Sequence, residues 1–91
     1  MSPEDVVERA ARVHERAAVT HARAADVHEA AAELQEQHAD EMFAAGRFDE
    51  GQRAVLQAAY ERTAASESRF RADIERSMAA TEDHRSHTTR N

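Results

Sequence analysis

A seven-residue motif repeats along the first half of the chain and sets the pattern of hydrophobic and polar positions there. Each copy begins with a β-branched residue and a histidine and ends with two alanines, as in Val-His-Glu-Arg-Ala-Ala at residues 13–18. Residues seven apart lie on one side of an α-helix, so the repeat predicts an amphipathic helix. Its small and apolar residues form a stripe wider than a two-stranded coiled coil needs.

The first helix is predicted over residues 3–45. Ser2 is a favourable N-cap, and Pro3 suits the first helical position. No helix-breaking residue follows until Gly46, which suits the left-handed conformation that ends many helices.

A second helix is predicted over residues 50–82, with Asp49 as its N-cap and residues 46–49 as the turn. A connection this short places two helices side by side and antiparallel. The expected fold is therefore all-α, a long antiparallel helical hairpin forming one domain over residues 1–82. Residues 83–91 contain no apolar side chain, and we expect them to form a flexible polar tail.

The stripe on the first helix predicts the surfaces through which helices pack. Its alanines allow a close approach, and large apolar residues of the second helix are expected to fill the space beside them. The predicted helix-packing interface consists of Val13, Ala17, Thr20, Ala24, Val27, Ala31, Leu34, Leu56, Ala59, Phe70 and Ile74. One hairpin covers only part of so wide a stripe, so we predict that two hairpins dimerise into a four-helix bundle.

His14, His21 and His28 recur at seven-residue spacing beside this stripe. Seven residues advance about 10.5 Å along a helix, so no two of these rings can share a metal ion within one helix. The expected role is packing at the edge of the core. Two alternatives are a metal or ligand site assembled across helices and a response to pH. If burial favours the neutral ring, stability is lost as the pH falls through the histidine range near about 6.5.

Composition limits the partners and the compartment. The chain has 91 residues, a formal net charge of -6 and no cysteine. An acidic surface argues against binding nucleic acid, and no apolar run is long enough for a membrane span. The acidic N-terminus lacks the features of a secretory signal peptide, so a cytoplasmic location is expected.

Catalytic motifs are missing from the sequence. No Glu-x-x-His occurs, which excludes the usual carboxylate-bridged di-iron bundle, and no serine stands in a nucleophile motif. We therefore expect no enzyme and no cofactor. The predicted function is a self-associating interaction or structural module whose partner is a second copy or another protein. The alternative is a metal- or small-ligand-binding bundle that uses the histidines.

Overall fold

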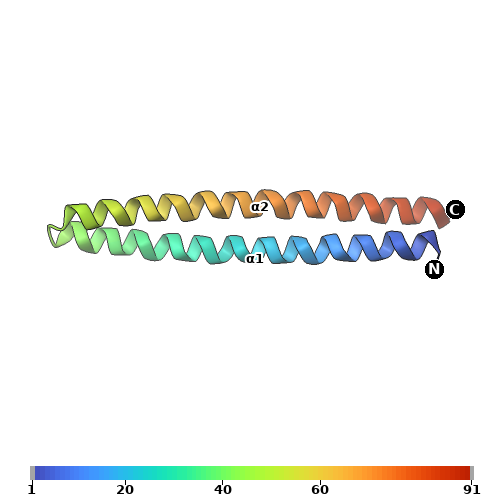
Figure 1. The fold of residues 1–91 in the computed structure, drawn as a ribbon, viewed down its shortest axis with the longest axis horizontal. Coiled ribbons are helices and arrows are strands. Elements are labelled where there is room, and N and C mark those ends of the chain that lie inside the picture. The colour runs from blue at the N-terminus through green and yellow to red at the C-terminus, as the bar shows by residue number, and fades with distance from the viewer. Residues whose placement is uncertain (1, 91) are drawn as a thin grey trace. The chain divides into compact units, whose positions relative to one another are not determined.

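Two long helices make up the described part of the chain. The computed structural model describes the backbone of residues 2–90 and the side chains of residues 2–85. Helix α1 spans Pro3–Ala44 and helix α2 spans Phe48–Arg90, with a short turn between them (Figure 1). The all-α helical hairpin predicted from the sequence is confirmed.

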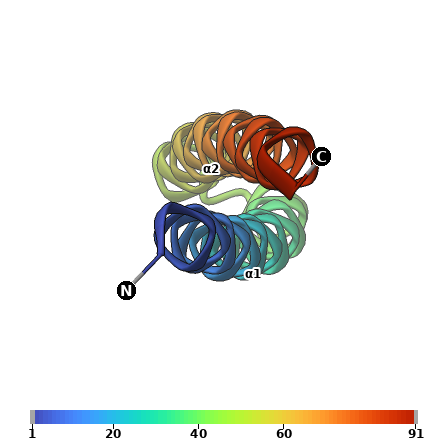
Figure 2. The same ribbon diagram turned by 90° about the vertical axis from the view of Figure 1, so that its right-hand side faces the viewer.

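The chain divides into two compact units, each containing a segment of both helices. The turn unit comprises Arg23–Ser68, and the terminal unit comprises Met1–Ala22 and Arg69–Asn91. Within each unit the two helical segments lie side by side (Figures 1 and 2).

The ends of α1 follow the predicted capping chemistry. The Ser2 hydroxyl oxygen accepts a hydrogen bond from the Asp5 backbone N–H at 3.3 Å. At the other end Gly46 has a φ of 76°. The Gly46 N–H donates to the Phe43 carbonyl at 3.0 Å, and the Arg47 N–H donates to the Met42 carbonyl at 2.8 Å. These two bonds form a Schellman motif, which satisfies carbonyls at the end of the helix.

The predicted bounds of the second helix need correction. It begins at Phe48, and the Gly51 N–H donates to the Arg47 carbonyl at 3.0 Å, so Asp49 lies in the first turn and is not the N-cap. A carboxylate in that turn still favours the helix dipole. The flexible polar tail was predicted over residues 83–91, but the backbone of residues 83–90 is helical, and Asn91 lies outside the described residues. Polar composition suggested a tail, but no glycine or proline interrupts the helix there.

The core between the helices consists of alanines alone among the apolar residues described. Ten of them are at most 8% exposed: Ala11, Ala18, Ala25, Ala32, Ala39, Ala54, Ala58, Ala65, Ala72 and Ala79. Most recur at seven-residue spacing on their helix, so each forms part of a column that faces the other helix. Side chains this small allow the two backbones to approach closely.

The seam between the helices therefore uses different columns from those predicted. On α1 it contains the buried alanines and the half-buried histidine column, Val7, His14, His21, His28, Gln35 and Met42. The α2 side is also small or polar, so the expectation that its large apolar residues fill the space beside the alanines is wrong. Those residues point elsewhere because two alanine columns already fit together in the seam.

Candidate functional site

Large apolar side chains lie on the surface in both units. Each of these residues has more than 40% of its surface exposed: Val6, Val13, Val19, Val27, Leu34, Phe48, Val55, Leu56, Tyr60, Phe70, Ile74 and Met78. Monomeric proteins rarely leave so many such residues without cover when they share one face. Their positions around the helices decide whether they form a common face.

The two sides of the seam differ in chemistry. On one side α1 carries a column of glutamates and α2 a column of arginines: Glu8, Glu15, Glu29 and Glu36, and Arg62, Arg69 and Arg76. In the turn unit the Arg62 Nε donates to Glu36 Oε1 at 2.7 Å. We call this side the charged side of the seam.

The opposite side of the seam is small and apolar, and we call it the apolar side. On α1 it carries the half-buried Ala10, Ala17, Ala24 and Ala31 and the exposed column of Val6, Val13, Thr20, Val27 and Leu34. In an antiparallel pair of helices, equivalent flanking columns lie on the same side of the seam. Residues of α2 in the equivalent columns therefore lie on this side as well, and they include the charged Glu67 and Arg71 beside the apolar Tyr60, Ile74 and Met78.

Contacts in the turn unit support this assignment. One shallow and largely polar depression is lined from both helices, by Gln35 and His38 of α1 and by Glu50, Arg53, Ala54 and Gln57 of α2. These residues occupy the columns at and beside the apolar side. The side of the seam opposite the Glu36–Arg62 pair is therefore shared by the two helices of this unit.

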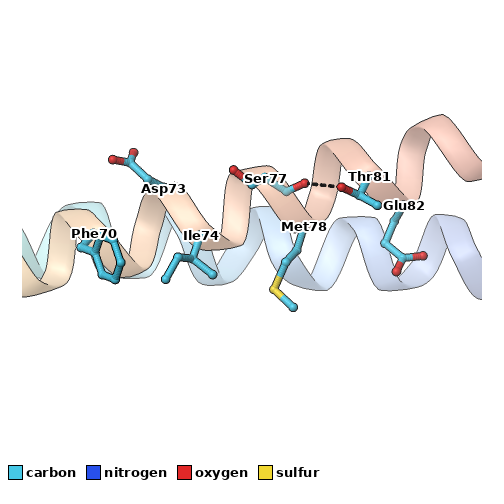
Figure 3. A pocket seen from close by; sticks show the side chains of 7 residues that line it. All are labelled: Phe70, Asp73, Ile74, Ser77, Met78, Thr81 and Glu82. Carbon is cyan, nitrogen blue, oxygen red and sulfur yellow. Dashed lines mark hydrogen bonds between the residues drawn. The ribbon is translucent and has the colours of Figure 1, made fainter.

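In the terminal unit, α2 contributes the larger side chains. Phe70, Ile74 and Met78 project to one side of the helix, while Asp73 and Ser77 project to the other (Figure 3). The first three also line a shallow depression on the surface of α2. Ile74 and Met78 adjoin the seam, and Phe70 lies further around the helix.

A histidine–glutamate pair crosses the seam in each unit. In the terminal unit His14 Nδ1 lies 2.5 Å from Glu75 Oε2, and in the turn unit His28 Nδ1 lies 2.6 Å from Glu61 Oε2. An ionised carboxylate only accepts hydrogen bonds, so the ring nitrogen in each pair carries the proton and donates it. Glu61 also accepts a bond from Gln57 Nε2 at 3.2 Å.

Both pairs are half-buried. The side chains of His14 and Glu75 are 25% and 24% exposed, and those of His28 and Glu61 are 37% and 20% exposed. The histidine column is the seam column next to Ala10, Ala17, Ala24 and Ala31. The pairs therefore lie at the base of the apolar side, where water still reaches them.

The third predicted histidine behaves differently. His21 is half-buried in the terminal unit, and it forms no hydrogen bond or ion pair among the residues that the structure describes. His38, which no prediction included, is exposed. The structure thus brings together two of the three predicted histidines with carboxylates of α2, and it places the third in the seam without one.

None of the eleven predicted interface residues is buried within the single chain. Ala17, Ala24 and Ala31 are half-buried, and the other eight are exposed: Val13, Thr20, Val27, Leu34, Leu56, Ala59, Phe70 and Ile74. As a description of the α1–α2 seam the prediction is wrong, because the neighbouring alanine column fills that place. As a description of an interface with a second copy it stays a prediction.

Glu61 and Glu75 were missed in the sequence. A signal was present, since the two glutamates are fourteen residues apart and so are His14 and His28. In an antiparallel hairpin equal spacings bring both pairs into register when one pair is aligned.

The structure and the comparisons add two findings. No helix in the described part of the chain is long and apolar enough to cross a membrane. Comparison with known protein families, curated proteins and solved structures gave no match.

Proposed function

We propose that the protein is a non-enzymatic, self-associating helical module, in which two copies pair through their apolar sides to form a four-helix bundle. The dimer would serve as a structural or interaction module in the cytoplasm. The observation that carries the proposal is the apolar side of α1, which exposes valine and leucine to solvent while every buried apolar residue in the described part of the chain is an alanine.

Exposed apolar side chains support such a contact. Val13, Val27 and Leu34 of α1 are 52%, 67% and 66% exposed. Burying a valine or leucine side chain stabilises a structure by about 1.5–3 kcal/mol, and the single chain does not gain this stabilisation.

Charge and periodicity favour a second copy as the partner. Two copies that each carry a formal charge of -6 repel one another unless they meet where carboxylates are missing. From Pro3 to Leu34 the two columns of the apolar side of α1 contain no charged residue, and the valine column ends in the charged Glu41 near the turn. Its alanine and valine columns share one spacing, so the surface can match itself across a two-fold axis.

The direct test is the mass in solution. Sedimentation equilibrium of the full chain from about 1 to about 100 μM should give a species of twice the 10.2 kDa chain mass. The double variant Val27→Arg/Leu34→Arg should be monomeric, because it places charge on the contact.

Val19→Arg is the matched control. Val19 is 47% exposed but lies among Arg12, Glu15 and Arg16, away from the apolar side. It should leave the dimer intact. A monomeric wild-type chain at the highest concentration contradicts the proposal, and so does equal disruption by Val19→Arg.

The alternative of a metal- or small-ligand-binding bundle stays a prediction. Each histidine–glutamate pair offers two donor side chains, and no cluster of three or more histidine, cysteine, aspartate or glutamate residues suited to a metal occurs in the described part of the chain. A metal would thus need ligands from a second copy. A melting temperature that rises with added Zn²⁺, and no longer rises in His14→Ala/His28→Ala, would favour this function.

A further inference from the structure

We infer that association is linked to protonation of the two histidine–glutamate pairs, so that the dimer forms with His14 and His28 as imidazolium ions against Glu75 and Glu61. The inference rests on the proposed self-association and concerns its regulation. It starts from the position of the pairs at the base of the surface that a second copy would cover.

Geometry connects the pairs to the proposed interface. Each ring nitrogen lies within 2.6 Å of a carboxylate oxygen. The side chains retain 20–37% of their exposure in the single chain. They adjoin Ala17 and Ala31 of the apolar side, one turn along α1. A second copy packed on those alanines removes water from the pairs without any need to rearrange them.

The surroundings of His28 leave its glutamate as the dominant charge. Residues one turn away on α1 are alanines: Ala24, Ala25, Ala31 and Ala32. From α2 the pair is flanked by Gln57, which donates to Glu61, and by Ala64. The charge state of this pair is thus decided by the imidazole and the carboxylate themselves.

His14 has more charged neighbours on α2. Glu75 is its direct partner, Arg71 lies one turn before Glu75, and Glu82 lies two turns after it in the same column. On α1 its neighbours one turn away are Ala10, Ala11, Ala17 and Ala18. Arg71 is the nearer of these two charges, so it partly compensates Glu75, and the linkage at His14 is weaker than the linkage at His28.

The sign of the linkage follows from the cost of burying a net charge. A neutral imidazole beside a carboxylate leaves one uncompensated negative charge when water is excluded. An imidazolium beside the same carboxylate gives a neutral, charge-assisted hydrogen bond. The dimer therefore holds more protons than two separate copies. Association is strongest in mildly acidic solution and weakens as the pH rises through the histidine range near about 6.5.

This sign is opposite to that expected from burial of histidine alone. Burial without a carboxylate favours the neutral ring, which would strengthen association at higher pH. The glutamate partners on α2 thus determine the direction. Replacing them with glutamine, which is uncharged and of similar shape, should reverse the pH dependence.

The experiment is sedimentation equilibrium of the full chain at about pH 5.5, 6.5, 7.5 and 8.5, in both moderate and high salt. The dimer dissociation constant of the wild type should rise at least about tenfold between pH 6.5 and 8.5, which corresponds to a mean net uptake of at least about half a proton for each dimer formed. High salt should preserve the slope, because a buried pair is screened less than surface repulsion.

Two variants separate this mechanism from a general effect of net charge. Glu61→Gln/Glu75→Gln should show the reversed dependence, with a dissociation constant that falls as the pH rises. His84→Gln removes an exposed histidine of α2 in the column of Phe70, away from the seam, and should keep the wild-type slope. Circular dichroism of each variant checks that its helices are intact. If the glutamine variant loses its helix, His14→Gln/His28→Gln replaces it and should lose the wild-type slope. Only the opposite dependence of His21, which is half-buried in the same column without a carboxylate, should remain.

The outcomes distinguish the two proposals. A chain that stays monomeric at every pH contradicts the proposed self-association. A dimer whose dissociation constant is the same at every pH, or one whose glutamine variant keeps the wild-type slope, contradicts the proton linkage and leaves self-association in place.

Discussion

At the residue scale, Gly51 shows how closely the helices approach. It is buried in the first turns of α2, where a Cβ atom would lie 2.6 Å from Phe43 Cε1. The Phe43 ring is half-buried and also packs against the Phe48 ring, with their centroids 5.9 Å apart. An aromatic ring held by a second ring has little freedom to move away.

We predict that Gly51→Ala destabilises the hairpin by about 1–3 kcal/mol, the usual cost of overpacking. Alanine favours helix over glycine by about 1 kcal/mol, so part of the steric cost is offset. Urea unfolding followed by circular dichroism measures the change. The double variant Gly51→Ala/Phe43→Leu should recover stability relative to Gly51→Ala, because the ring is the group that clashes. A fully neutral Gly51→Ala would contradict this packing.

Two adjacent alanines provide a second test at this scale. Ala25 is 0% exposed in the seam, whereas Ala24 is half-buried on the apolar side. Ala25→Leu should overpack the seam and cost about 1–3 kcal/mol in the free energy of unfolding. Ala24→Leu is the matched control, and at concentrations where the chain is monomeric it should change stability by less than about 0.5 kcal/mol. An equal loss of stability in the two variants would contradict this contrast, because it would mean that both columns lie equally close to α2.

At the scale of the elements, the end of α1 depends on the left-handed Gly46. Its φ of 76° allows the Schellman motif that turns the chain toward α2. A side chain at this position meets no atom within 4 Å, so any cost of substitution comes from the backbone.

Gly46→Ala is therefore expected to cost about 1–2 kcal/mol, the penalty for an L-residue in the left-handed region. Gly46→Asn should cost clearly less, since asparagine tolerates that conformation. Thermal unfolding of both variants measures the difference. The ranking, with asparagine above alanine, separates backbone strain from a general intolerance of larger residues in the turn.

The elements were more predictable than their contacts. Ser2 and Gly46 carry local signals, because a capping hydroxyl and a left-handed glycine act through their own backbone neighbours. The sequence of α1 alone does not show which alanine column faces α2, because Ala17 and Ala18 are adjacent residues of the same type. It depends on α2, which presents Ala58, Ala65 and Ala72 on one side and arginines beside them. The position of Glu61 and Glu75 opposite the histidines depends on the same register. These pairs could therefore be predicted only by aligning the two helices.

At the scale of the molecule, small residues lie between the helices and larger ones lie outside. Leu34 and Tyr60 are 66% and 75% exposed, while each buried apolar residue of the described chain is an alanine. An alanine core gives little hydrophobic stabilisation per residue, because the area removed from water is small. The stability of such a hairpin should therefore depend strongly on whatever covers its apolar side.

This dependence predicts a melting temperature that rises with protein concentration. If two copies fold and pair together, mass action adds about 1.4 kcal/mol to the stability of the dimer for each tenfold increase in concentration. For a dimer of this size the expected shift is about 3–6 °C per tenfold. Scanning calorimetry or circular dichroism melts from about 5 to about 500 μM would measure it. Val27→Arg/Leu34→Arg should melt at one temperature throughout that range, and Val19→Arg should keep the wild-type dependence. A wild-type melting temperature that does not change with concentration would mean that the alanine core alone sustains the fold, and that the exposed valines and leucines contribute nothing to its stability.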